Sequence, residues 1–174
     1  MARGGGPGLT SETRDQLAEL IGYYQQLIGH YQSIAEFGQD EVILIDQGDM
    51  EALMTILCDK EKIMAEVAKC QEKIGAIQDT FVNRYQLESF SLNKLKAVVD
   101  SSNRDLLEKL RKVIKQLIKE LEILEQQEKI HESMLKSFAE EVQKKQARKQ
   151  AKAGAKAYEK IIEPKPDNDI DLKR

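Results

Sequence analysis

The stretch that decides the fold is EVILIDQGDMEAL, residues 41–53. At its centre, Asp46-Gln47-Gly48-Asp49 combines the end of one helix with the start of another. Gly48 can adopt the left-handed backbone conformation that ends a helix, and Asp49 can accept a hydrogen bond from a free amide of the next helix. So short a connection forces the two helices to lie antiparallel. The sequence therefore predicts a helical hairpin that turns at residues 46–49.

Apolar residues recur at steps of three and four on both sides of this turn, as in the seam of a coiled coil. Before the turn they are Leu17, Leu20, Tyr24, Leu27, Tyr31, Ile34, Gly38, Val42 and Ile45; after it they are Leu53, Ile56, Ile63, Val67, Cys70, Ile74, Ile77 and Phe81. Each arm is about 36 residues long, or roughly 54 Å at 1.5 Å per residue. Gly38 would let a facing helix approach closely, or would only weaken its own helix.

Lys60 is the one residue of the second seam that is out of character. Its long stem can lie along the seam while the ammonium reaches solvent or pairs with an acid across the hairpin. Because Leu would complete the apolar stripe, the sequence predicts that Lys60→Leu is neutral or stabilising.

A third long helix is predicted after an interruption between Tyr85 and Asn103, which holds a short helix over residues 92–99. Its apolar positions, together with one histidine, are Leu106, Leu110, Val113, Leu117, Leu121, Leu124, His131, Leu135, Phe138 and Val142. A helix of this length suits packing along the hairpin as a third arm. We therefore predict an all-α, coiled-coil-like bundle: a long antiparallel hairpin, a third long helix and a flexible C-terminal tail.

The predicted bundle covers residues 11–142, with a flexible leader at 1–10 and a tail at 143–174. The tail begins with a basic run, Lys144 to Lys156, that contains no acidic residue, and ends in mixed charges after Pro164. It offers too little apolar surface to offset the entropy of ordering, which predicts frayed helix followed by disorder. A solvated tail is the favoured interpretation of the basic run, and a contact to phosphate groups is the alternative.

Composition excludes several classes of protein. The formal net charge of −3 argues against a dedicated nucleic-acid binder, and no stretch approaches the roughly 18 apolar residues of a membrane span. The N-terminus lacks the apolar core of a signal peptide, so we expect a cytoplasmic protein. Cys58 and Cys70 are expected on one helix about 18 Å apart, too far for a disulfide.

The sequence carries no recognisable catalytic or cofactor motif. Neither His30 nor His131 belongs to a cluster with cysteines or paired acids at metal-ligand spacing. His131 falls on the seam of the last helix, where a buried, satisfied histidine is a more common finding than a ligand. We therefore predict a non-enzymatic binding protein with no cofactor and no metal ion.

A second apolar stripe on the last helix is the candidate partner site. Ile123, Ile130 and Met134 lie together on a side of the helix away from the main seam. One interpretation is further core contact or a homodimer contact; the other is an exposed surface for a partner's helix.

Several stretches resemble the FlgN-type flagellar export chaperones. They are Gly48-Asp49-Met50-Glu51-Ala52-Leu53 followed by Leu57, Lys60 and Glu61; Leu106-Leu107-Glu108-Lys109-Leu110 at the start of the last helix; and Tyr158 followed by Ile170-Asp171-Leu172-Lys173-Arg174. The resemblance spans roughly residues 15–172. Two positions depart from the family pattern: His131 stands where Asn is frequent, and no Gly follows Tyr158 closely.

The resemblance implies a cytoplasmic chaperone that binds the C-terminal helices of hook-associated proteins and prevents their premature assembly. It also implies that Tyr158, in the tail, contributes to docking at the flagellar export gate. The alternative function is a structural coiled-coil scaffold or dimerisation protein.

Overall fold

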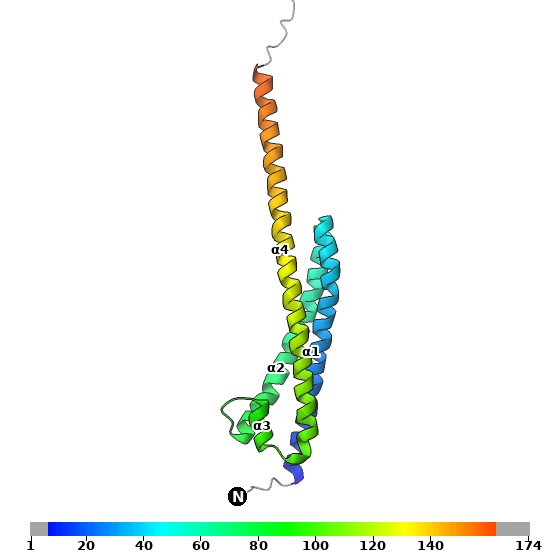
Figure 1. Ribbon diagram of the computed structural model, residues 1–174, viewed down its shortest axis with the longest axis vertical. Coiled ribbons are helices and arrows are strands. Elements are labelled where there is room, and N and C mark those ends of the chain that lie inside the picture. The colour runs from blue at the N-terminus through cyan, green and yellow to red at the C-terminus, as the bar shows by residue number, and fades with distance from the viewer. Residues whose placement is uncertain (1–6, 163–174) are drawn as a thin grey trace, which may run out of the picture.

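The computed structural model describes residues 7–162, and describes side chains for residues 11–156. In this range the chain forms four α-helices and one short 3₁₀ turn, and no strand. The elements are α1 (Pro7–Gln47), α2 (Met50–Tyr85), α3 (Leu92–Val98), η1 (Ser101–Asn103) and α4 (Arg104–Ile162) (Figure 1). The predicted all-α fold is confirmed.

The turn between α1 and α2 has the predicted chemistry. Gly48 has a φ of 71°, and its N–H donates to the carbonyl of Ile45 at 3.1 Å. The N–H of Asp49 donates to the carbonyl of Leu44 at 3.0 Å, and the Asp49 carboxylate accepts from the Ala52 N–H at 3.0 Å. These bonds satisfy the free carbonyls of one helix and a free amide of the next, which fixes the hairpin.

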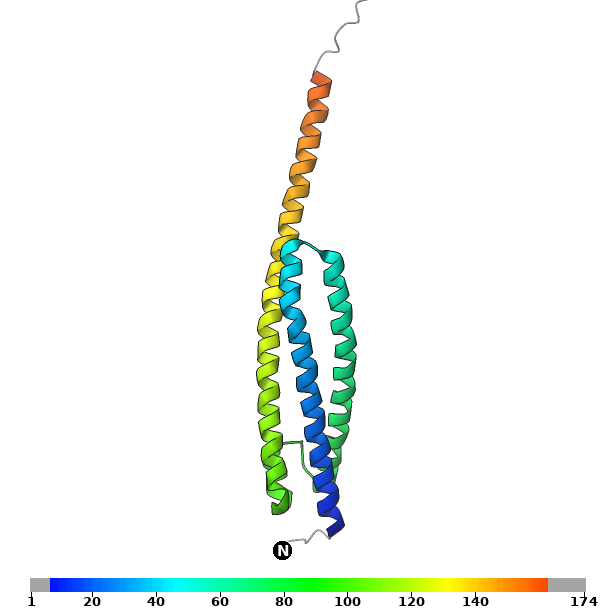
Figure 2. The same ribbon diagram turned by 90° about the vertical axis from the view of Figure 1, so that its right-hand side faces the viewer.

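The three long helices form an open layer with α1 in the middle. Figure 2 shows α4 on one side of α1 and α2 on the other. α1 packs along both neighbours, while the backbones of α2 and α4 hardly approach each other. These two helices are joined by α3 at one end and by the Lys60–Glu128 ion pair near the other. The last long helix is therefore the predicted third arm, but it packs on α1 rather than closing a bundle with both arms of the hairpin.

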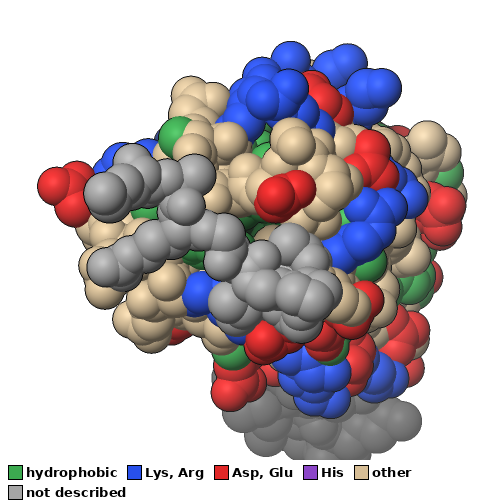
Figure 3. Space-filling view, turned by 90° about the horizontal axis from the view of Figure 1, so that it is seen from below, with side chains coloured by type: hydrophobic (Ala, Val, Ile, Leu, Met, Phe, Trp, Pro, Cys, Tyr) green, Lys and Arg blue, Asp and Glu red, His purple; other side chains and the backbone are tan. Residues whose placement is uncertain are grey.

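Buried apolar residues line the layer along its length, but most of the side chains with no exposed surface lie in the half farthest from the hairpin tip. Leu17, Leu20, Phe81, Leu95 and Leu110 have no exposed surface there. The outer surface at this end carries interspersed acidic and basic side chains, as Figure 3 shows. This end of the layer is therefore the best packed.

Two helices extend beyond their predicted bounds. α1 begins at Pro7, inside the predicted leader, because proline is favourable in the first turn, where its missing N–H costs nothing. α4 continues without a break through the predicted tail to Ile162, because the alanine, lysine, glutamine and arginine of this stretch are strong helix formers. Residues 163–174 lie outside the described part of the chain.

Two glycines should respond oppositely to alanine. Gly48→Ala should destabilise the protein by about 1–2 kcal/mol, because a side chain is strained at positive φ and the new Cβ would lie 3.2 Å from Phe138. Gly29→Ala, at an exposed helical site with open space around it, should stabilise by about 0.5–1 kcal/mol. Urea denaturation measures both. A Gly48→Ala protein as stable as the wild type would show that the left-handed turn is not required.

Candidate functional site

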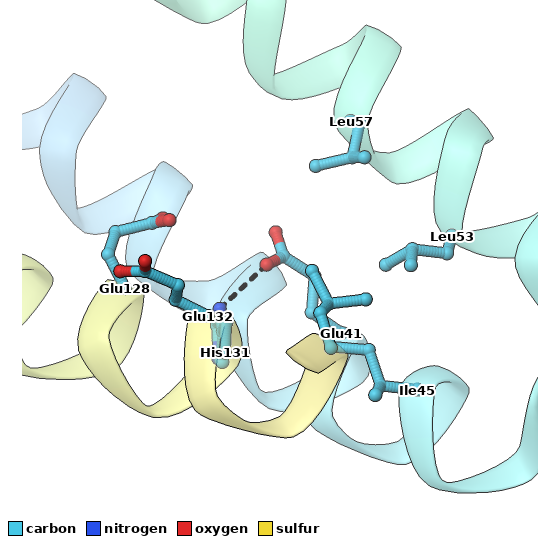
Figure 4. A pocket seen from close by; sticks show the side chains of 8 residues that line it. Glu41, Ile45, Leu53, Leu57, Glu128, His131 and Glu132 are labelled. Carbon is cyan, nitrogen blue, oxygen red and sulfur yellow. Dashed lines mark ion pairs between the residues drawn. The ribbon is translucent and has the colours of Figure 1, made fainter. Parts of the chain in front are cut away.

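Four polar side chains from three helices meet near the hairpin tip. The Lys60 ammonium, from α2, lies 2.8 Å from an oxygen of Glu41 on α1 and 2.8 Å from an oxygen of Glu128 on α4. The other oxygen of Glu41 lies 2.8 Å from Nδ1 of His131, also on α4 (Figure 4). We call these four residues the Glu41 cluster.

Glu41 is the centre of this cluster and is almost fully buried. Its side chain is 3 % exposed and that of His131 is 5 % exposed, whereas Glu128 is well exposed. Lys60 donates an aligned hydrogen bond to Glu128, but the contacts of Glu41 with Lys60 and His131 are close without hydrogen-bond alignment. Attraction between charges, more than directional bonding, therefore compensates for the burial of Glu41.

Lys60 stays charged in this environment. Burial of the ammonium lowers its pKa, but the hydrogen bond that it donates to Glu128, its close contact with Glu41 and the negative charges of both carboxylates outweigh that effect and raise the pKa. A raised pKa in the folded state means that Lys60 contributes its stabilisation at neutral pH. That contribution is lost only when the pH rises through the folded pKa, above the ordinary lysine value of 10.5.

The cluster also contains the donor atoms of a metal site. Glu41, Glu128 and His131 each offer one donor atom, and these three atoms lie within 4.8 Å of one another. A set of one imidazole and two carboxylates suits a divalent transition-metal ion. The Lys60 ammonium already lies 2.8 Å from each carboxylate, so an ion would have to displace it. We therefore assign the cluster to holding three helices together.

A groove opens beside the cluster, toward the hairpin tip. It has a volume of about 340 Å³, with α1 as its floor and α2 and α4 as its walls. Its apolar lining consists of Ile45, Leu53, Leu57 and Leu135. The rest of the lining is polar and consists of Glu132 and the cluster residues Glu41, Glu128 and His131. Leu57 is 39 % exposed and Leu135 is 38 % exposed. We call this surface the tip groove.

The predicted partner site lies on a different flank of α4. Ile123 and Ile130 are about half exposed, at 47 % and 55 %, and Met134 is half-buried. At 100° per residue, the two isoleucines lie roughly 120–140° around the helix from Leu135 in the tip groove. Neither isoleucine is a core residue of the single chain. The backbone of Tyr158 belongs to α4, but its side chain lies outside the described residues.

Sequence reasoning missed the tip groove because its residues come from three helices. Leu57 falls off the predicted seam, and Leu135 was assigned to the seam but is only partly covered. The available signal was Lys60, whose position in an apolar stripe suggested an acid across the hairpin. Two acids meet it, one on each neighbouring helix.

Comparison with protein families, curated proteins and solved structures finds no match for this chain. No helix in the described residues is both long and apolar enough to cross a membrane. The case for a function therefore rests on the geometry of the tip groove and on the resemblance seen in the sequence.

The sequence predicts that Lys60→Leu is neutral or stabilising, but the Glu41 cluster makes the opposite outcome the expected one. Removing the ammonium leaves Glu41 buried without its cation, so this variant should lose about 2–4 kcal/mol of unfolding free energy. The double variant Glu41→Leu/Lys60→Leu removes both buried charges and should recover most of that loss. Urea denaturation at neutral pH compares the two proteins. If the single variant matches the wild type, Lys60 does not stabilise the buried carboxylate.

Proposed function

We propose that this chain is a cytoplasmic, non-enzymatic chaperone that binds an amphipathic helix of a client protein in the tip groove. The observation that carries the proposal is an apolar groove between two helices, with Leu57 and Leu135 partly exposed on its opposite walls. Recognition of a helix in such a groove uses apolar anchors spaced three and four residues apart.

The layered arrangement of the helices supports this occupant. Because α2 and α4 both pack on α1 and their backbones stay apart, the face between them beyond the Lys60–Glu128 ion pair has the shape that a further helix would fill. Ile45 of α1 contributes to the apolar floor of the groove and Leu53 to its α2 wall, while Glu128 and Glu132 border it on α4. A client helix with an apolar stripe and a neighbouring basic residue would complement both features.

The resemblance to the FlgN-type family supplies the identity of the client. In that family the clients are hook-associated proteins, bound through their C-terminal helices and delivered to the flagellar export gate. Hiding these helices prevents premature assembly, which is a task that an apolar groove suits. In this proposal the tail with Tyr158 contacts the gate.

A structural scaffold or dimerisation role is the second candidate. Ile123 and Ile130 are exposed and seven residues apart, the spacing of a coiled-coil contact between two copies. Sedimentation analysis separates the candidates, because a scaffold should dimerise without a client. A client-binding chaperone should form a heterodimer.

Paired charge substitutions decide which surface holds the client. Leu57→Glu/Leu135→Glu should weaken binding of a hook-associated C-terminal peptide at least about a hundredfold, since each buried leucine contributes roughly 1.5–3 kcal/mol. The matched control is Ile123→Glu/Ile130→Glu, which should change the affinity less than about threefold. Isothermal titration calorimetry measures the affinities. Because all four side chains are partly exposed, circular dichroism should show unchanged helicity.

The reverse pattern would place the client on the predicted isoleucine patch. An unchanged affinity in both variants, with the fold intact, would remove both surfaces as client sites. No binding of any hook-associated C-terminal peptide by the wild-type protein would overturn the flagellar proposal itself.

Tyr158 provides a separate test of the delivery step. Tyr158→Ala should leave client affinity within about twofold, because this residue lies far along α4 from the tip groove. It should nevertheless reduce secretion of the client in a flagellated host, measured as hook-associated protein in the culture medium. Tyr24→Phe is the control for loss of a tyrosine hydroxyl elsewhere. Equal secretion in both variants would rule out a delivery role for Tyr158.

A further inference from the structure

The C-terminal part of α4 projects alone beyond the hairpin tip. Phe138 lies against Gly48 at the turn, and Figures 1 and 2 show α4 continuing past that point with no neighbouring helix. Residues 139–162 would extend about 36 Å at 1.5 Å per residue. The part of this projection from residue 143 to residue 156 is exposed along almost its whole length, and we call it the basic arm.

All six charged side chains of the basic arm are cations, and they share one face. At 100° per residue they fall within an arc of roughly 140°, while the opposite face carries only alanine, glutamine and glycine. The six are Lys144, Lys145, Arg148, Lys149, Lys152 and Lys156. Among residues 11–156, the only ion pair that includes an arm residue is a long one, 3.9 Å between Lys145 and Glu141. The other arm cations have no acidic partner within that range, so they can face an external anion.

The arm is electrostatically separate from the acidic body. The whole chain carries −3, so removing the six arm cations leaves −9 on the remainder. The middle of the arm, near Gln150, lies roughly 18 Å beyond Phe138. That distance exceeds the Debye length of about 8 Å at physiological ionic strength, so the body does not cancel the arm's attraction for anions.

We propose that the basic arm binds the phosphate backbone of double-stranded DNA through this one face, without reading the base sequence. Lysine and arginine spaced along about 18 Å of helix can each neutralise a phosphate and release its counterions. The small residues on the other face keep the helix narrow, and the major groove of B-form DNA, about 12 Å wide, admits a helix. Nothing in this inference depends on the proposed chaperone function.

The side chains that other polyanions would use are missing from the arm. An amphipathic membrane helix needs bulky apolar residues opposite its cations, and here that face carries mainly alanine and glutamine. Binding of single strands relies on aromatic stacking, and residues 143–156 contain no aromatic residue. The major groove of duplex RNA is too deep and narrow for such a contact. A cationic helix that lacks both bulky apolar residues and aromatic residues therefore favours duplex DNA.

The test uses the full chain and a fluorescently labelled DNA duplex of about 20 base pairs, the length scale of two helical turns. Fluorescence anisotropy should show binding that weakens by roughly one thousandfold to two thousandfold between 50 and 200 mM NaCl, as expected for about six phosphate contacts. The variant Lys144→Gln/Arg148→Gln/Lys152→Gln should bind with a log–log salt slope smaller by about 2.7. Glutamine preserves helix propensity, and circular dichroism verifies the helix.

The matched control removes the same charge from the body, in the variant Lys62→Gln/Lys69→Gln/Lys129→Gln. These lysines are exposed on α2 and α4 below the tip, so the salt slope for DNA should match that of the wild type. If DNA binding weakened equally in both variants, the loss would follow from the change in net charge alone, and the proposal would be overturned. The absence of DNA binding at 50 mM NaCl would also overturn it, as would tighter binding to phosphatidylserine vesicles or duplex RNA than to duplex DNA.

Discussion

α1 buries two faces at once, and the rest of the structure depends on this. Leu20 and Leu27 are followed directly by the buried residues Ile21 and Ile28, so the apolar surface of α1 is wider than the seam of a two-stranded coiled coil. Such a width serves two partners, and α2 and α4 pack against it from either side. Because each outer helix buries its apolar face on α1, the backbones of α2 and α4 stay apart, and the layer stays open apart from α3 and the Lys60–Glu128 ion pair.

The same constraint explains why the hairpin tip differs from the opposite end. Far from the tip, α3 joins α2 to α4, and aliphatic and aromatic side chains fill the core. Near the tip, three helices are held by Glu41, whose two oxygens face Lys60 on one side and His131 on the other. A buried charged cluster is costly unless all its members are present. It fixes the positions of the helices without filling the space beside it with side chains, and that space is the tip groove.

α4 connects the two proposed binding surfaces. Its middle forms one wall of the tip groove through Leu135, and its end forms the basic arm beyond the hairpin turn, against which Phe138 lies. The change comes where apolar residues give way to alanine, glutamine and lysine. Up to that point packing on α1 stabilises the helix, and beyond it the intrinsic helix propensity of those residues does so. Both surfaces can therefore be occupied without competing for the same residues.

The hairpin was predictable from residues 41–53 because its turn is specified locally: Gly48 adopts a conformation that other residues avoid, and Asp49 bonds within its own first turn. The seams were predictable because helical periodicity is also local. The same periodicity placed Phe138 on the apolar stripe of the third arm, and Phe138 lies against Gly48 of the turn. At Gly38, which was open to two interpretations, the Gln127 side-chain amide of α4 lies 3.0 Å from where a Cβ would be, so a side chain here would meet that amide. Periodicity could not show that α1 serves two helices instead of one. Nor could it show that Glu41, Lys60 and His131 meet, because residues of three separate helices are brought together only by the packing of those helices.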